Sequence, residues 1–146
     1  MERMDNSVDS RPINIFVVED DDGDAKAVMR AFKQAKLANP VYRAVDGVQA
    51  LEILRGDNPP PSPFIMLVDL KMPRMDGIQL VKELRKDPRY KRQVVFILTT
   101  SKSEEDKSRA YDLNVAGYIL KETAGRDFLE LVSLLGNYWR VVELPE

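Results

Sequence analysis

Short apolar runs alternate with longer amphipathic segments along this chain. Three of the runs are nearly continuous and rich in β-branched and aromatic residues, at positions 13–18, 64–68 and 94–98. Runs of this kind are typical of central strands in a parallel sheet that is covered on both faces. Two weaker runs, at 41–45 and 117–120, predict two further strands.

Amphipathic segments that fit helices follow each of these runs. They cover positions 24–37, 47–55, 78–85, 104–113 and 126–138. In the first of them, apolar side chains recur on one face at helical spacing, namely Ala25, Val28, Met29 and Phe32. Strands that alternate with helices predict a doubly wound α/β fold with a parallel five-stranded sheet, because parallel neighbours need crossover connections. We expect right-handed crossovers, with helices on both faces of the sheet.

Composition excludes several classes of protein. The chain has 146 residues, of which 32% are charged, and a formal net charge of −2. The length suits one domain, and the balanced charge predicts no binding to nucleic acid or to an anionic membrane. No apolar run approaches the ~20 residues of a membrane span. Residues 1–11 are polar, lack the apolar core of a signal peptide and are expected to form a disordered extension.

Two residue types are missing altogether. Cysteine is absent, which excludes disulfides and thiolate metal sites and is compatible with a cytoplasmic location. Histidine is absent too. Its absence excludes histidine acid–base chemistry, histidine metal ligands and an internal phosphohistidine.

Chemically active residues follow the predicted strands. In open α/β sheets, ligands bind beyond the carboxyl ends of the strands, near the topological switch point. The segment after the first strand, 19–24, holds five carboxylates in six positions. Asp69 follows the third strand, Thr99 the fourth and Lys121 the fifth. The sheet is therefore expected to gather acids, a hydroxyl and a lysine at one edge.

Carboxylates gathered in this way need a cation. Two of them ~4 Å apart repel by ~4 kcal/mol at an effective dielectric constant near 20. Oxygen ligands without histidine or cysteine favour a hard ion, Mg²⁺ first and Mn²⁺ or Ca²⁺ next. With Lys121 as a positive charge and Thr99 as a hydroxyl donor, a carboxylate here is equipped to accept a phosphoryl group as an acyl phosphate.

These motifs resemble the receiver domain of two-component response regulators over about residues 13–138. Asp69, in Val-Asp-Leu-Lys-Met-Pro, stands at the phospho-acceptor position. Glu19 and Asp20 stand at the acidic pair. The Met-Asp-Gly turn that follows also matches, with Asp76 placed to cap the next helix.

The second half of the chain extends the resemblance. Thr99 stands at the switch hydroxyl and Thr100 at the small residue beside it. Tyr118 stands at the switch aromatic, and Lys121, three residues later, at the invariant lysine. The resemblance implies a flavodoxin-like sheet with strand order 2-1-3-4-5.

The resemblance also implies a mechanism. A histidine kinase or a histidine phosphotransfer protein donates a phosphoryl group to Asp69. Asp20, Asp69 and the backbone carbonyl of Lys71 would hold Mg²⁺, with Glu19 acting mainly through water. The protein is then a phospho-acceptor with self-catalysed phosphotransfer and autodephosphorylation, and is not otherwise an enzyme.

The switch would follow from phosphorylation. Lys121 and Thr99 contact the new oxygens, and the shift of Thr99 lets Tyr118 turn inward. This movement remodels the face formed by the fourth helix, the fifth strand and the fifth helix, as a two-state element biased by a local change of charge.

Two features depart from the family pattern. Glu122 follows Lys121 where the family usually has proline, often after a cis peptide. A cis bond before a residue other than proline costs ~2.5–4 kcal/mol, so this loop is either trans or strained. The first acid is Glu19 where many members have aspartate, a variant that should keep metal binding intact.

The ends of the chain add to the expected organisation. We expect a receiver domain over residues 12–139 and a tail over 140–146, with no attached output domain, so that output runs through protein contacts. The apolar and aromatic end of the chain is similar to that of response regulators of bacterial phytochrome histidine kinases. It suggests docking in a homodimer, or a tail folded back on its own domain.

Other interpretations stay open for individual residues and for the whole chain. Asp22 and Asp24 fit the start of a helix, where acids are favoured. Thr99 and Thr100 could be strand residues with satisfied hydroxyls, Tyr118 a packing residue, and Lys121 a surface lysine. For the whole chain the rivals are an aspartyl-phosphate hydrolase of the haloacid dehalogenase type and a phosphorylation-independent scaffold. The hydrolase pattern has a second aspartate where this chain has Lys71.

Overall fold

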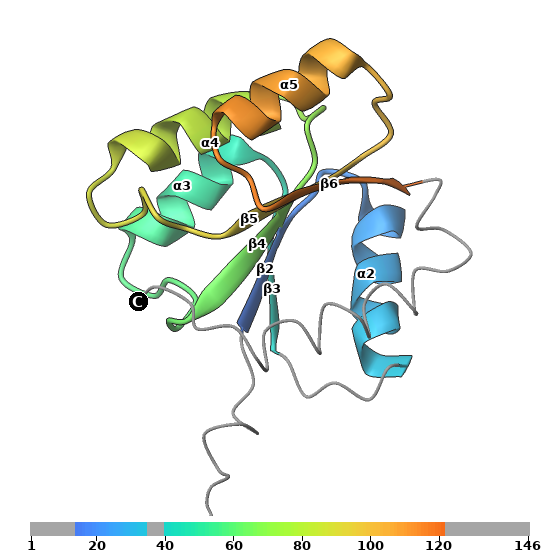
Figure 1. Cartoon of the computed structure of the whole chain (residues 1–146). Helices are drawn as coiled ribbons and strands as arrows, with labels where there is room; N and C mark the ends of the chain where they lie inside the picture. The colour runs from blue at the N-terminus through green and yellow to red at the C-terminus, as the bar shows by residue number, and fades with distance from the viewer. Residues whose placement is uncertain (1–13, 35–39, 122–146) are drawn as a thin grey trace, which may run out of the picture.

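Five parallel strands form a single sheet in the order β3-β2-β4-β5-β6. The computed structural model describes residues 14–34 and 40–121 (Figure 1). The strands are β2 (Asn14–Val18), β3 (Val41–Ala44), β4 (Phe64–Val68), β5 (Val95–Thr99) and β6 (Gly117–Leu120). Counted along the chain, this is the order 2-1-3-4-5, so the expected doubly wound α/β fold is confirmed.

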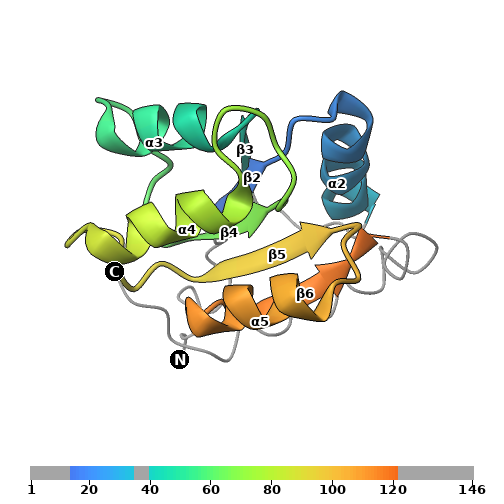
Figure 2. The same ribbon diagram turned by 90° about the horizontal axis from the view of Figure 1, so that it is seen from above.

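Helices cover both faces of the sheet. They are α2 (Asp22–Gln34), α3 (Gly47–Arg55), α4 (Gly77–Lys86) and α5 (Glu104–Asp112). Helix α2 lies on one face, and α3, α4 and α5 lie on the other (Figures 1 and 2). No helix within residues 14–34 and 40–121 is long and apolar enough to cross a bilayer. The helix expected at 126–138, the N-terminal extension and the tail at 140–146 lie outside the described residues.

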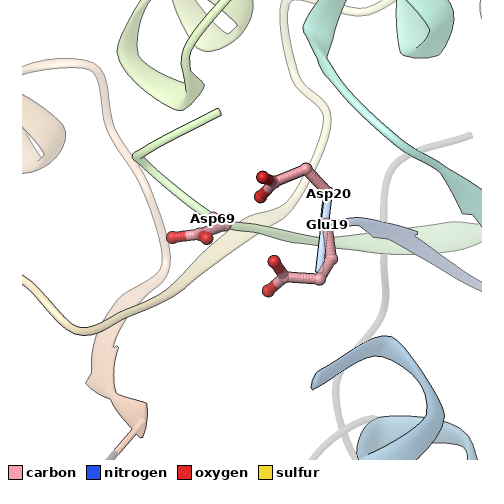
Figure 3. Close-up of side chains that lie close together, drawn as sticks. All are labelled: Glu19, Asp20 and Asp69. Atoms are coloured by element: carbon pink, nitrogen blue, oxygen red, sulfur yellow. The ribbon is translucent and has the colours of Figure 1, made fainter. Parts of the chain in front are cut away.

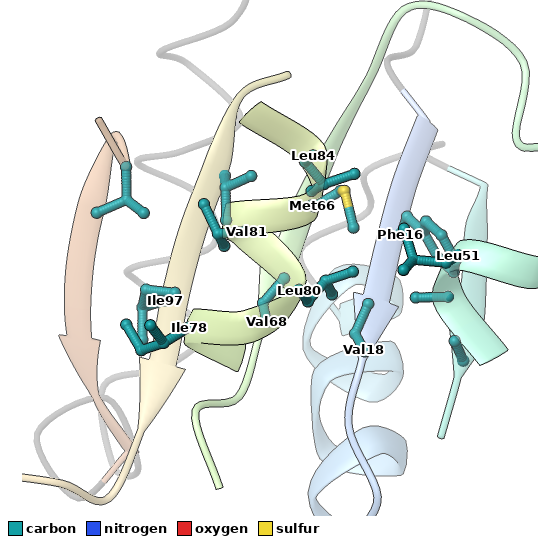
Figure 4. Packing of buried hydrophobic residues seen from close by; sticks show 14 of the residues in the cluster. Phe16, Val18, Leu51, Met66, Val68, Ile78, Leu80, Val81, Leu84 and Ile97 are labelled. Carbon is teal, nitrogen blue, oxygen red and sulfur yellow. The ribbon is translucent and has the colours of Figure 1, made fainter. Parts of the chain in front are cut away.

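Two hydrophobic clusters, one on each face, hold the layers together. Odd and even positions of the strands point to opposite faces, because side chains alternate along a strand. Phe16, Val18, Met66 and Val68 pack against α3 and α4 in the larger cluster (Figure 4). The smaller cluster joins the intervening strand residues to α2 and contains Ile15, Val17, Ile65, Leu67, Val28 and Phe32. Because central strands are buried on both sides, they read as continuous apolar runs.

The start of α2 lies two residues before the predicted start at position 24. The Asp21 carboxylate accepts a hydrogen bond from the Asp24 N–H at 2.8 Å, and the Asp21 carbonyl accepts one from the Ala25 N–H at 3.0 Å. Asp21 thus satisfies N–H groups of the first turn, as a helix N-cap does. Part of the acidic segment is therefore helical, which fixes where its later side chains point.

The register of the sheet positions the site. Val18 of β2 pairs with Val68 of β4, and the Asp69 N–H donates to the Val18 carbonyl at 3.0 Å. Glu19 follows β2 directly, and its N–H donates to the carbonyl of Ala44, the last residue of β3, at 3.0 Å. Glu19 and Asp69 therefore leave neighbouring strands side by side, at the edge where ligands of such sheets bind.

Candidate functional site

Three carboxylates meet at the carboxyl ends of β2 and β4 (Figure 3). Glu19, Asp20 and Asp69 each offer an oxygen, and these oxygens all lie within 4.8 Å of one another. Glu19 and Asp69 are buried, with 3% and 7% of their surfaces exposed, whereas Asp20 is open to solvent. Carboxylate charges at such short distances repel one another, most strongly where they are buried, and they need a cation beside them.

Lys121 supplies one positive charge to this group. Its Nζ lies 2.7 Å from Glu19 Oε1, 2.7 Å from Asp24 Oδ2 and 3.2 Å from Asp69 Oδ2. The lysine comes directly after β6, whose last residue pairs with Thr99 of β5. The expected meeting of Lys121 with the acidic edge is thus observed, and Asp24 takes part in it as well.

Burial and contact with Lys121 pull the pKa values of this group in different directions. Burial raises the pKa of Glu19 to about 7, although the hydrogen bonds from Lys121 and from the Asp21 N–H lower it. Burial lowers the pKa of Lys121, but its hydrogen bonds to Asp24 and Glu19 outweigh this and raise the pKa above its usual value. Lys121 therefore stays charged, while Glu19 changes its charge near neutral pH.

The end of β5 contributes a hydroxyl, and the loop that leads from β5 to α5 is hydrogen-bonded to a side chain of β6. Thr99 is fully buried, and its Oγ1 accepts a hydrogen bond from the Ser101 N–H at 3.2 Å. The Tyr118 hydroxyl donates to the Ser101 carbonyl at 2.9 Å, and the Tyr118 ring packs against the larger cluster. Ser101 thus joins Thr99, one strand away from Asp69, to the aromatic side chain of β6.

A second polar group links the loops after β4 and β5 to α5. Asp106, in the first turn of α5, accepts a hydrogen bond from Ser101 Oγ at 2.6 Å and lies 3.4 Å from Lys71 Nζ. The Ser101 hydrogen bond and the Lys71 charge hold the pKa of Asp106 below its usual value. Ser103 caps the helix by accepting from the Asp106 N–H. No motif in the sequence signals this arrangement.

The turn after Asp69 is built as the sequence predicts. Asp76 caps α4: its carboxylate accepts from the Gln79 N–H at 2.9 Å, and Gln79 Oε1 accepts from the Asp76 N–H at 3.0 Å. This reciprocal pair is a capping box. The Gly77 N–H donates to the Leu70 carbonyl at 2.9 Å, so the helix start lies directly against the backbone that carries Asp69.

The carboxylates fit a hard divalent cation. Three acidic oxygens within 4.8 Å, with no nitrogen or sulfur ligand among them, are the donor set that Mg²⁺, Mn²⁺ and Ca²⁺ prefer. The Lys71 N–H faces Asp69 Oδ1 at 3.4 Å, so the main chain of Lys71 runs beside the cluster. The role of the Lys71 carbonyl as a metal ligand stays a prediction.

This chain is similar to known proteins in sequence and in fold. The family model of the response regulator receiver domain matches residues 15–133. The response regulator Rcp1 from Synechocystis sp. is 30% identical over 92% of this chain and 94% of its own length. Two solved structures are similar as well, the phosphorylated cyanobacterial phytochrome response regulator RcpA and the Mn²⁺-bound form of Rcp1. Both are 30% identical, with TM-scores of 0.81 and 0.80; they cover 93% and 92% of this chain, and all of each solved chain is covered.

The fold and the acidic edge define the class of this protein as a flavodoxin-like α/β domain with a site at its switch point. The chain belongs to the response regulator receiver domain family. It is a receiver-domain protein related to phytochrome response regulators, and receiver domains take phosphoryl groups from histidine kinases.

The sequence predicted most of the side chains that meet here. The five residues that it placed at this edge lie at the ends of their strands, namely Glu19, Asp20, Asp69, Thr99 and Lys121. It missed Asp24 and Asp106. Asp24 was interpreted as a helix-start residue, which it is, but its carboxylate also contacts Lys121.

Proposed function

We propose that this protein is a phospho-acceptor switch that takes a phosphoryl group on Asp69 from a histidine kinase or a histidine phosphotransfer protein. The observation that supports this best is the local environment of the Asp69 carboxylate. The carboxylate is nearly buried, lies 3.2 Å from the Lys121 ammonium, and is grouped with two further acids. A nucleophile placed against a fixed positive charge is equipped for phosphoryl transfer.

The chemistry uses few groups of the protein. An Asp69 oxygen attacks the phosphorus of a phosphohistidine, so that an O–P bond forms while the P–N bond breaks and the imidazole nitrogen leaves with the electron pair. Lys121 stabilises the phosphoryl oxygens by charge and hydrogen bonding. Asp20, Asp69 and the Lys71 carbonyl would hold Mg²⁺, with Glu19 acting through a water, and the ion would supply further charge neutralisation; Mn²⁺ or Ca²⁺ could replace it. Attack by water on the phosphorus returns the carboxylate and inorganic phosphate.

The output of the switch is a change of protein contacts. Thr99 turns its hydroxyl to the phosphoryl group, and its partner Ser101 carries the carbonyl that holds Tyr118. A movement of Thr99 therefore reaches the aromatic side chain through one residue. We propose that the chain acts in the cytoplasm as a homodimer, without nucleic acid, and is not an enzyme beyond its own phosphorylation and dephosphorylation.

A phytochrome-type light sensor is the proposed input. The relatives Rcp1 and RcpA support a phytochrome-type light sensor upstream, since RcpA is named as a phytochrome response regulator. Incubation with the phosphorylated kinase domain of such a sensor tests this part by transfer of label.

Intact-protein mass spectrometry tests the switch itself. After incubation with acetyl phosphate and Mg²⁺, we expect one phosphate adduct, absent in Asp69→Asn and after chelation of the metal. If phosphorylated kinases also give no adduct, the chain is instead a receiver-fold scaffold that works without phosphate. Release of many phosphates per chain from phosphate esters would identify a hydrolase.

A further inference from the structure

Lys121 contacts two carboxylates besides that of Asp69, the proposed phospho-acceptor. An ammonium group has three N–H donors. Three carboxylates surround this one, and the two short contacts, both 2.7 Å, are to Glu19 and Asp24, while Asp69 lies 3.2 Å away. Two of the three N–H groups are thus taken by Glu19 and Asp24, and the third faces Asp69, the proposed phospho-acceptor.

Helix α2 fixes the position of Asp24. The Asp24 N–H is bound by the Asp21 carboxylate at 2.8 Å, and the next residue, Ala25, is buried against the sheet. The side chain of Asp24 is 48% exposed, whereas that of Lys121 is 16% exposed. Asp24 therefore reaches in from the rim of the site toward a lysine that is mostly enclosed.

Asp24 stands apart from the carboxylates that fit a metal. The group whose oxygens lie within 4.8 Å of one another comprises Glu19, Asp20 and Asp69. A cation bound there competes with Lys121 for Glu19. Asp24 is then the carboxylate that keeps Lys121 at the site.

We propose that Asp24 is a positioning residue that holds the Lys121 ammonium with one N–H directed at Asp69. The inference rests on the proposed function and extends it. When the acyl phosphate forms, the carboxylate charge of Asp69 is replaced by a charge of about −1.5 to −2 on the phosphoryl oxygens. The longest of the three contacts, that to Asp69, passes to a phosphoryl oxygen, while Asp24 keeps its own. Asp24 thus orders Lys121 before phosphorylation rather than during it.

Asp22 offers a matched control in the same turn of α2. It carries the same charge, is 78% exposed, and pairs with Arg43 at 2.7 Å instead of Lys121. Asp22→Asn and Asp24→Asn therefore change the net charge equally, but only the second removes a partner of Lys121. Asp24→Glu keeps the carboxylate and serves as the conservative variant.

The first test needs no phosphorylation. The metal-free protein is acylated by a water-soluble N-hydroxysuccinimide ester, and the labelling rate of Lys121 is followed by peptide mass spectrometry. Asp24→Asn should raise this rate about two- to fivefold, the factor expected from one partly exposed ion pair. Asp22→Asn should leave the rate unchanged, and Asp24→Glu should restore it. Equal rates in Asp24→Asn and the wild type would overturn the inference.

The second test measures phosphorylation by acetyl phosphate at saturating Mg²⁺. Asp24→Asn should slow the initial rate about two- to fivefold, with the Mg²⁺ affinity equal to that of Asp22→Asn. A faster rate would mean that Asp24 competes for Lys121, and a specific loss of Mg²⁺ affinity would make it a metal ligand; either result overturns the inference. If the wild type takes no phosphoryl group, the proposed function fails while the labelling test still decides the role of Asp24.

Discussion

Gly77 lies where a larger residue meets the backbone of the acceptor strand. A Cβ added there would lie 2.9 Å from Leu70 Cα and 3.1 Å from the Asp69 carbonyl carbon. Backbone atoms cannot rotate away, as the end of a side chain can. The Asp-Gly pair that the sequence matches to the family turn therefore has a steric reason as well as a capping one.

We predict that Gly77→Ala lowers the free energy of unfolding by about 1–3 kcal/mol, the usual range for overpacking a filled site. Urea denaturation measures the difference. Gly23→Ala is the control, because the added Cβ would meet one side-chain atom, Asp21 Oδ1 at 3.1 Å, and no backbone, and alanine is favoured over glycine in a helix by about 0.5–1 kcal/mol. Equal stability of Gly77→Ala and Gly23→Ala would contradict the close packing of Gly77 against the backbone of Asp69 and Leu70.

The Asp46 carboxylate makes two kinds of contact, one to the start of a helix and one to a loop. Asp46 caps α3 by accepting from the Gln49 N–H at 2.9 Å, and it also accepts from Arg74 Nε at 2.7 Å. Arg74 lies in the loop between β4 and α4, with a φ of 64°. One buried side chain thus ties the loop that follows Asp69 to the start of the neighbouring helix.

Substitutions at Asp46 separate the two tasks. Asp46→Asn keeps an oxygen for the cap and loses the ion pair, whereas Asp46→Ala also loses the cap, which is worth about 1 kcal/mol. We therefore predict that Asp46→Ala is the less stable of the two in thermal unfolding. Equal stability of the two variants would show that the cap contributes nothing.

The pH dependence of stability isolates the ion pair. Arg74 holds the pKa of Asp46 below its usual value. A carboxyl whose pKa is lowered in the folded state stabilises the fold above its unfolded pKa, about 3.9, and this stabilisation is lost as the pH falls through the folded pKa. We expect Asp46→Asn to lack this contribution, so that its difference in stability from the wild type shrinks at acid pH.

At the scale of elements, sequence patterns predicted type and order better than boundaries. Continuous apolar runs identified β2, β4 and β5, because burial on both faces leaves little room for polar residues. The start of α2 was placed two residues late, since the capping role of Asp21 is hidden in a run of acids.

Contacts between distant side chains were beyond the sequence patterns. Asp24 and Lys121 are 97 positions apart, and no spacing rule joins an acid in a first helical turn to a lysine after the last strand. Asp106, in the first turn of α5, likewise contacts Lys71, which lies in the loop after β4. Strand-end residues could be predicted because parallel strands end at one edge, whereas these pairs depend on the exact position of a helix.

For the molecule as a whole, burial of an ionised Glu19 opposes folding. The pKa of Glu19 is about 7 in the folded protein against an ordinary value of 4.5, because of burial. The folded state therefore holds a proton more tightly than the unfolded state, and stability falls as the pH rises from 4.5 to about 7. A divalent cation bound there would need the ionised carboxylate and would offset the cost of burying it.

We predict that Mg²⁺ raises the melting temperature more at pH 8 than at pH 6. The metal binds the folded state and stabilises it by mass action, and protonation of Glu19 competes with binding at the lower pH. Glu19→Gln should remove most of the pH dependence of this shift. An equal shift at both pH values in the wild type would contradict the charge state assigned to Glu19.

Chemical trapping tests most directly whether Asp69 carries the phosphoryl group. Borohydride reduces an aspartyl phosphate to homoserine, which leaves a permanent mark on the acceptor. The protein is incubated with acetyl phosphate and Mg²⁺, reduced, digested and sequenced by mass spectrometry. We predict homoserine at position 69 alone, and none when Mg²⁺ is chelated. Homoserine at position 20 or 24, or at no position while a phosphorylated kinase domain also fails to label the chain, would contradict the assignment.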